Sequence, residues 1–192
     1  MNPKNFEFLK KGQFKRIDKS DEGNIDRKIL SLVDKINKKE GYYTTSSCAG
    51  RVVLMVGQEK KQEGLYLFKS HEKISPGEFR KAISSSAKKH GGLVYFKMES
   101  CILHIACKSL QGAQELLDRA KMAGWKKTGI ISAGRRIVCE ISSTEKMEMP
   151  VADKGRALIT GILLKIILKE ANIKLERTWK KIKRLEKLLK KE

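Results

Sequence analysis

The stretch Thr44-Thr45-Ser46-Ser47-Cys48-Ala49-Gly50-Arg51 stands between the aromatic pair Tyr42-Tyr43 and the apolar run of residues 52–56. We interpret it as a small polar loop that leads into a strand. Hydroxyl and thiol side chains, a glycine and an arginine meet there, so backbone N–H groups and a guanidinium could converge on one anionic ligand. The alternative is an ordinary loop followed by an exposed arginine at the strand end.

The composition limits the class of protein. The 192 residues are 40% hydrophobic and 33% charged, which fits one globular domain or two small packed lobes with a hydrophobic core. The net charge of +20 favours a polyanionic partner, with nucleic acid as the leading candidate. No apolar run approaches the roughly 18 residues of a membrane span, and the N-terminus lacks a signal-peptide core. We therefore expect a cytoplasmic protein without membrane contact.

The four cysteines are Cys48, Cys101, Cys107 and Cys139, at wide spacings without a C-x-x-C pair. This spacing favours neither a zinc ribbon nor a disulfide framework, so we expect reduced, mostly buried thiols and no metal site.

Hydrophobic periodicity predicts an α+β fold with mainly antiparallel strands and flanking helices, not a Rossmann fold. Helices are expected over residues 24–39, 77–90 and 110–123, and strands over residues 42–45, 51–56, 65–69, 93–99, 102–107, 125–132 and 136–141. The strands at 93–99 and 102–107 are expected to form a hairpin.

A weak internal repeat suggests a pseudo-duplication. One copy runs from Gly41-Tyr42 to Ala49-Gly50-Arg51, and the other runs from Gly124-Trp125 to Ala133-Gly134-Arg135. The alternative is two unrelated β-hairpins, in which glycine is a common turn residue.

The character of the chain changes near its end, which suggests a division into a body of residues 1–155 and a basic amphipathic helix of residues 156–192. Residues 154–192 hold 13 Lys or Arg against 4 Glu. Lys180 and Lys183 on this helix are candidate phosphate contacts, and the alternative is a solvated outer face. Binding to a membrane surface is less favoured, because a second anchoring signal is missing.

Three side chains are candidate general bases or orienting groups. His71 follows the strand at 65–69, His104 alternates with apolar residues in a strand, and Glu99 ends the strand before it. A lone histidine in a strand is, by the alternative reading, a hydrogen-bonded structural residue.

The chain contains none of the Rossmann, P-loop, α/β-hydrolase or zincin signatures. A more specific pattern is formed, in order, by Ile25-Asp26, Tyr43-Thr44-Thr45-Ser46-Ser47-Cys48-Ala49-Gly50-Arg51, Ser70-His71, Phe96-Lys97-Met98-Glu99, Ile102-Leu103-His104 and residues 120–129. This pattern resembles the wybutosine-synthesising tRNA methyltransferase family, in an archaeal-type form, over roughly residues 5–155. The resemblance implies methyl transfer from S-adenosylmethionine to N-4 of a tricyclic wyosine-type base. That base is built from the guanosine 3′ of the phenylalanine-tRNA anticodon.

Two positions depart from the family pattern. Ala49 stands where the family commonly has serine. Gly124-Trp125-Lys126-Lys127-Thr128-Gly129 replaces a Gly-Phe-Arg-Glu-Ser-Gly-like element, so Lys127 stands where an acid is expected. The second change argues against a catalytic role at position 127.

Three groups of site residues are expected, of which Lys180 and Lys183 are inferred from charge alone because the C-terminal helix lies outside the resemblance. Cofactor contacts are expected from Ser46, Ser47, Cys48, Gly50 and Arg51. Catalytic roles are expected among His71, Glu99 and His104. Substrate contacts are expected from Tyr43, Trp125, Arg135, Lys180 and Lys183, with the two aromatic rings stacking on the modified base. The alternative for Tyr43 and Trp125 is an ordinary place in the core.

Two other functions fit the sequence. One is a non-catalytic RNA-binding module that presents tRNA to another enzyme, and the other is a different enzyme that binds a nucleotide at the same loop. No stable protein partner is expected.

Overall fold

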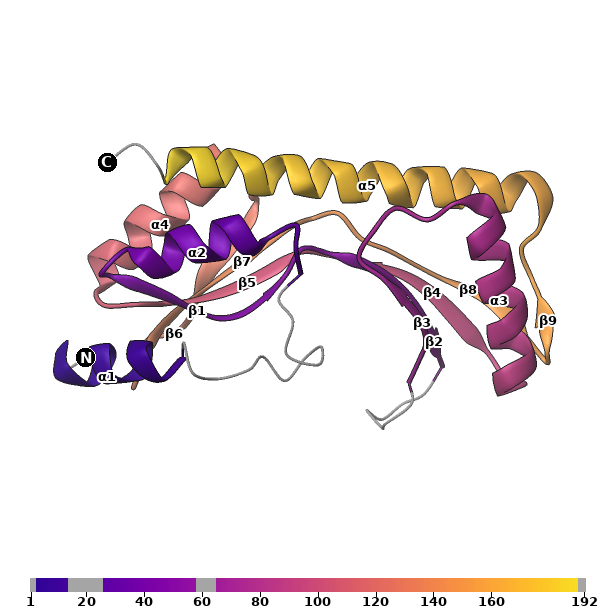
Figure 1. Ribbon diagram of the computed structural model, residues 1–192, viewed down its shortest axis with the longest axis horizontal. Helices are drawn as coiled ribbons and strands as arrows, with labels where there is room; N and C mark the ends of the chain where they lie inside the picture. Colours follow the sequence, from indigo (N-terminus) through magenta and orange to yellow (C-terminus); the bar gives the residue numbers. More distant parts are fainter. Residues whose placement is uncertain (1–2, 14–25, 58–64, 190–192) are drawn as a thin grey trace. The chain divides into compact units, whose positions relative to one another are not determined.

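Two antiparallel sheets organise the chain in the computed structural model, which describes residues 3–13, 26–57 and 65–189 (Figure 1). Unit 1 comprises residues 1–49, 100–144 and 178–192, and unit 2 comprises residues 50–99 and 145–177. The predicted α+β fold with antiparallel strands is confirmed. The predicted boundary at residue 155 stays a prediction, since these units describe packing and each draws on residues from both sides of it.

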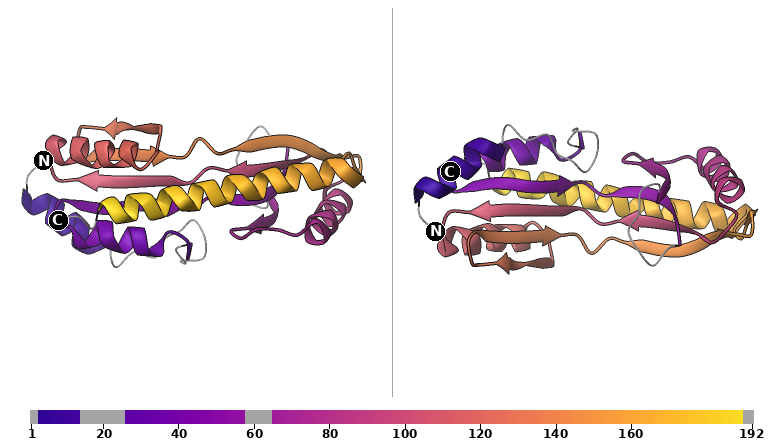
Figure 2. Two further views of the ribbon diagram at one scale, coloured as in Figure 1. Left: turned by 90° about the horizontal axis from the view of Figure 1, so that it is seen from above. Right: turned by 90° about the horizontal axis from the view of Figure 1, so that it is seen from below.

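Unit 1 is built on a four-stranded sheet of order β1-β5-β7-β6. The strands are β1 (Tyr42–Cys48), β5 (Ile102–Cys107), β7 (Ile137–Ser142) and β6 (Lys127–Ser132). Three helices supply apolar side chains to the core on one face, namely α2 (Leu30–Lys38), α4 (Leu110–Met122) and the last part of α5 (Gly161–Leu188). In both views of Figure 2 the end of α5 lies beside α2. On the other face, α1 (Pro3–Gln13) places Phe6 on Tyr43 and Ala106.

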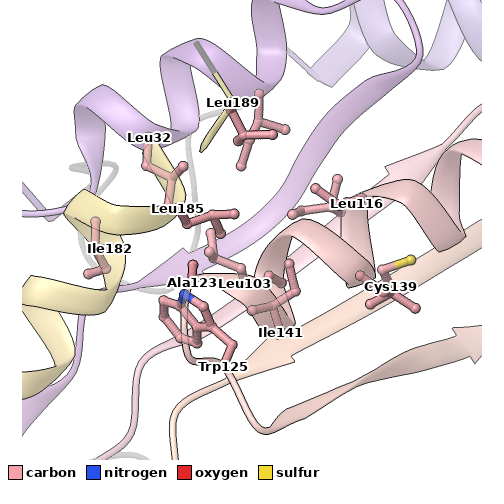
Figure 3. Close-up of a cluster of buried hydrophobic side chains, with 14 of the residues drawn as sticks. Leu32, Leu103, Leu116, Ala123, Trp125, Cys139, Ile141, Ile182, Leu185 and Leu189 are labelled. Carbon is pink, nitrogen blue, oxygen red and sulfur yellow. The ribbon is translucent and has the colours of Figure 1, made fainter. Parts of the chain in front are cut away.

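The core of unit 1 lies between the sheet and these helices (Figure 3). Leu103 and Ile141 come from the sheet, Leu32 and Leu116 from α2 and α4, and Leu185 from α5. Each of these side chains is nearly or fully buried. Alternate residues of β5 face this core, which leaves His104 on the opposite face of the sheet.

Unit 2 is built on a five-stranded sheet of order β3-β2-β4-β8-β9. Its strands are β3 (Tyr66–Ser70), β2 (Arg51–Val56), β4 (Val94–Glu99), β8 (Met147–Asp153) and β9 (Arg156–Ala157). Helix α3 (Pro76–His90) packs Phe79 edge-on against Phe96 at 5.1 Å between ring centroids. The first part of α5 is tied to the start of α3 because the Asn172 side chain bonds both the N–H and the carbonyl of Ile74.

The structure corrects several element predictions. Residues 44–48 are not a loop but the continuation of β1. β4 and β5 do not form a hairpin, because β4 pairs with β2 and β8 whereas β5 pairs with β1 and β7. The short connection at Ser100 and Cys101 leads from one sheet to the other. Strands β8 and β9 and helix α1 were not predicted, and part of the first predicted helix lies outside the described residues.

The two copies of the proposed repeat do not form equivalent hairpins. β6 and β7 pair directly, but β1 and β2 belong to different sheets. The shared Ala-Gly-Arg sequence therefore marks a hairpin turn in one copy and a passage between sheets in the other.

Candidate functional site

Three polar side chains form a hydrogen-bonded row across the sheet of unit 1. Ser46 on β1 is paired in register with His104 on β5, and His104 is paired with Glu140 on β7. The Oγ of Ser46 lies 2.9 Å from His104 Nδ1, and His104 Nε2 lies 2.9 Å from Glu140 Oε2. A hydroxyl, an imidazole and a carboxylate in this order form an arrangement in which the imidazole can accept the proton of the hydroxyl and the carboxylate orients the imidazole.

A β-bulge in β1 brings Ser46 into this row. The register shifts between Thr44, which is paired with Ile105, and Ser46, which is paired with His104. Thr45 is the extra residue, and its hydroxyl donates to the backbone carbonyl of His104 at 3.3 Å. The bulge changes which residues of β1 face away from the core, so it aims Ser46 at the imidazole.

The row is accessible to a ligand. The side chain of His104 is 31% exposed and that of Glu140 is 39% exposed. Gly129 on β6 is paired with Glu140, and a Cβ added at Gly129 would meet no atom within 4 Å. The open face beside Glu140 is therefore not filled by a side chain of β6.

Arg51 and Glu99 face each other in unit 2, on paired positions of β2 and β4. Arg51 Nε donates to Glu99 Oε2 at 2.6 Å, and its Nη2 donates to the hydroxyl of Tyr66 at 3.0 Å. The guanidinium also lies over the Tyr66 ring, 5.0 Å from its centroid. Arg51, which was predicted to bind an anionic ligand, is thus held by two protein side chains. Glu99, which was predicted as a candidate base, already accepts a hydrogen bond from Arg51.

Ala49 and Gly50 link β1 to β2, and the backbone of both residues is constrained. Gly50 is buried and has φ of 88°, a left-handed conformation that favours glycine. The N–H of Ala49 donates to Asp26 at 3.3 Å, and the Ala49 side chain is buried in the core of unit 1. The alanine that replaces the family serine is thus a core residue in this chain.

The structure contradicts the stacking role predicted for Tyr43 and Trp125. Tyr43 is 1% exposed and lies against Phe6, at 5.1 Å between ring centroids. Trp125 is 0% exposed and belongs to the core of unit 1 (Figure 3). Both rings fill protein interior, so neither presents a face to an incoming base.

The other predicted residues are distributed over both units. Arg135 is exposed in the turn between β6 and β7, and Lys180 and Lys183 are exposed on α5. Ser47 and Cys48 are half-buried on β1. His71 is half-buried directly after β3 in unit 2, so it belongs to a different unit from His104.

The thiols are all free, and three of them are buried as predicted. Burial raises the pKa of the Cys101 thiol well above its ordinary value, which keeps it protonated. Among the described residues, no group of three or more His, Cys, Asp and Glu could hold a metal ion, and no helix has the length and hydropathy of a membrane span.

Glu140 was missed by the sequence reasoning. The signal was a single acid in the apolar strand at 137–142, in the same alternating position as His104 in its own strand. Recognising the pair requires knowing that these two strands are neighbours in this register.

Comparisons with known proteins agree with the predicted resemblance. Residues 4–191 match the family described as methyltransferase TYW3. A Thermococcus sibiricus protein named tRNA(Phe) 7-((3-amino-3-carboxypropyl)-4-demethylwyosine(37)-N(4))-methyltransferase is 36% identical, over 95% of this chain and 93% of its own length. A Xenopus laevis protein named tRNA wybutosine-synthesizing protein 3 homolog is 31% identical, over 93% of this chain and 72% of its own length.

The fold is also found among solved structures. The PH1069 protein from Pyrococcus horikoshii has a TM-score of 0.86 and 33% identity, with 97% of each chain covered. A protein from Aeropyrum pernix has a TM-score of 0.70 and 26% identity, with 86% of this chain and 98% of that chain covered. The chain, a methyltransferase without a Rossmann fold, belongs to the methyltransferase TYW3 family.

Proposed function

We propose that this protein transfers a methyl group from S-adenosylmethionine to N-4 of a tricyclic wyosine-type base in tRNA(Phe). The names of the relatives support this substrate, and membership of a methyltransferase family favours the enzyme over the non-catalytic RNA-binding alternative. The observation that carries the proposal is the contact between Ser46 and His104 on the accessible face of the unit 1 sheet.

The chemistry requires a proton acceptor at the ring nitrogen. N-4 bears a hydrogen before methylation and a methyl group afterwards, so its proton has to leave as the new bond forms. Both imidazole nitrogens of His104 already have protein partners. Ser46 is therefore the group that meets N-4, and His104 acts as the base through the serine hydroxyl.

The residues at the β1–β2 link suit the proposed methyl donor. S-adenosylmethionine, when bound, supplies an electrophilic methyl group on a sulfonium. Ser47 and Cys48 offer a hydroxyl and a thiol, and the next residues along the chain offer the Gly50 N–H and the Arg51 guanidinium for a carboxylate. Glu99 and Tyr66 already hold the Arg51 guanidinium in place. We therefore expect Arg51 to orient the carboxylate of the methyl donor with a cation whose position is fixed before binding.

The phosphates of tRNA have candidate partners in both sequence and structure. Arg135, Lys180 and Lys183 are exposed cations, and the net charge of the chain is +20. Contacts to phosphates give affinity for RNA without recognising its base sequence. Recognition of the modified base is therefore left to the accessible face of the unit 1 sheet that carries Ser46 and His104.

The test is transfer of labelled methyl from S-adenosylmethionine to tRNA(Phe) that carries the tricyclic precursor. We expect wild type to label that base, and His104→Ala and Ser46→Ala to lose about a hundredfold in turnover, in line with the loss of a general base. His90→Ala, at the end of α3, is the matched control and should keep wild-type turnover.

Two results would contradict the proposal. Tight tRNA binding without cofactor binding or label transfer would favour the RNA-presenting module. Label transfer that survives His104→Ala and Ser46→Ala would place the base elsewhere, with His71 as the next predicted candidate.

A further inference from the structure

Glu140 is the described residue that completes the row on the unit 1 sheet, and neither the sequence pattern nor the family resemblance assigns it a role. It stands on β7, directly across from His104. Its carboxylate oxygen lies 2.9 Å from His104 Nε2, with both side chains about one-third exposed. A carboxylate only accepts hydrogen bonds at neutral pH, so this contact requires a hydrogen on Nε2.

The position of that hydrogen fixes the chemistry of the other ring nitrogen. A neutral imidazole carries one N–H, so the hydrogen on Nε2 leaves Nδ1 as an acceptor. Nδ1 then accepts from the hydroxyl of Ser46, at 2.9 Å. Without the carboxylate, the hydrogen could stand on Nδ1, and Ser46 would lose its acceptor.

We propose that Glu140 is a positioning residue that holds His104 in the Nε2–H form, ready to receive a proton from Ser46. The effect on methyl transfer rests on the function proposed above, whereas the effect on the imidazole does not. This role is the one that the carboxylate plays in hydroxyl–imidazole–carboxylate groups on unrelated folds.

The step balances in atoms and charge. The carbon–sulfur bond of the sulfonium breaks as the bond between N-4 and the methyl carbon forms, with S-adenosylhomocysteine as the leaving group. The N-4 proton passes to Ser46 Oγ while the serine proton passes to His104 Nδ1. The resulting imidazolium faces the Glu140 carboxylate, and its proton is later released to water.

Two variants separate charge from the hydrogen bond. Glu140→Gln keeps the shape of the side chain and removes its charge, and Glu140→Ala removes the acceptor altogether. Glu148→Gln is the matched control, because Glu148 is an exposed strand carboxylate in unit 2 that pairs with Lys97 at 2.7 Å.

The readouts are methyl-transfer kinetics and the nitrogen NMR spectrum of the His104 ring in the whole protein, assigned with His104→Ala. In wild type at alkaline pH we expect hydrogen on Nε2. In Glu140→Ala we expect a mixture of the Nε2–H and Nδ1–H forms. We expect Glu140→Ala to lower kcat at least about tenfold with little change in KM, Glu140→Gln to lower kcat through loss of the charge that faces the imidazolium, and Glu148→Gln to change neither kcat nor KM.

The outcomes decide the proposal. An unchanged ring spectrum in Glu140→Ala overturns it, as does a kcat of Glu140→Ala within twofold of that of an active wild type. A fall in kcat that accompanies a lower unfolding midpoint and an unchanged ring spectrum also overturns it, because Glu140 would then be a structural residue. If wild type transfers no methyl group but Glu140→Ala shifts the ring hydrogen, the proposed function fails while the positioning role stands.

Discussion

Gly129 is the residue whose missing side chain leaves space next to Glu140. Gly129→Val would place a branched side chain on the open face, where an added Cβ would meet no atom within 4 Å. A branched residue suits a strand, so we expect the free energy of unfolding to stay level or rise by about 0.5 kcal/mol. If the substrate base approaches over this face, KM should rise severalfold. Chemical denaturation and steady-state methyl transfer measure the two effects.

The matched control is Thr128→Val, which places a side chain of the same size on the other face of β6. Thr128 is paired with Ile141, whose side chain lies in the core. We expect this variant to keep wild-type KM. An unchanged KM in Gly129→Val would mean that the base approaches from another direction.

The chemistry of the site was more predictable than its geometry. Ser46 and His104 were selected by residue type and by the family resemblance, and the structure joins them by a hydrogen bond. Simple alternation from Tyr43 would instead have placed Thr45 and Ser47 on the face of His104. The bulge at Thr45 depends on pairing with β5, a strand distant in sequence, so no local pattern could reveal it.

At the scale of elements, α3 shows how a local sequence sets a helix start. Ser75 and Glu78 form a capping box, in which Glu78 N–H donates to Ser75 Oγ and Ser75 N–H donates to the Glu78 carboxylate. Hydrogen bonds from Ser75 lower the pKa of Glu78. The folded state therefore favours the carboxylate, and its contribution is present at neutral pH and lost as the pH falls through the folded-state pKa of Glu78.

Ser75→Ala removes one side of this box. We expect the free energy of unfolding to fall by about 1 kcal/mol, the usual cost of a lost helix cap. Chemical denaturation over a series of pH values from 7 downward measures the change, and the difference from wild type should shrink as the pH falls through the folded-state pKa of Glu78. Ser84→Ala, at an exposed position inside α3, is the control and should not lower stability. An equal loss at every pH of the series would contradict the role of the Glu78 carboxylate.

Elements with strong local signals were predicted, whereas their pairing was not. α3 and α4 begin at Ser caps and were placed within one residue of their observed ends. The strands at 94–99 and 102–107 were also recognised, but their short separation suggested a hairpin. The chain instead leaves one sheet and enters the other there, a choice set by contacts with strands far along the sequence.

At the scale of the whole molecule, the charge of +20 predicts tRNA binding that weakens with salt. Each lysine that contacts a phosphate should contribute about one unit to the slope of log Kd against log salt concentration. We expect the Lys180→Ala, Lys183→Ala double variant to lower that slope by up to about two units without changing the ring spectrum of His104. Filter binding over a salt series measures the slope.

The control for this prediction is Lys88→Ala with Lys89→Ala, which removes two exposed lysines from the end of α3. We expect it to change the slope less. An equal loss in the two double variants would indicate a diffuse attraction rather than contacts made by α5.

The division of each unit among separate stretches of chain has a consequence for its synthesis. The chain passes from one unit to the other at residues 49–50, 99–100, 144–145 and 177–178. The unit 1 sheet is complete by Ser142, but its core also needs Ile182, Leu185 and Leu189. A nascent chain would thus lack part of this core until these residues emerge, and neither unit is available as a contiguous fragment.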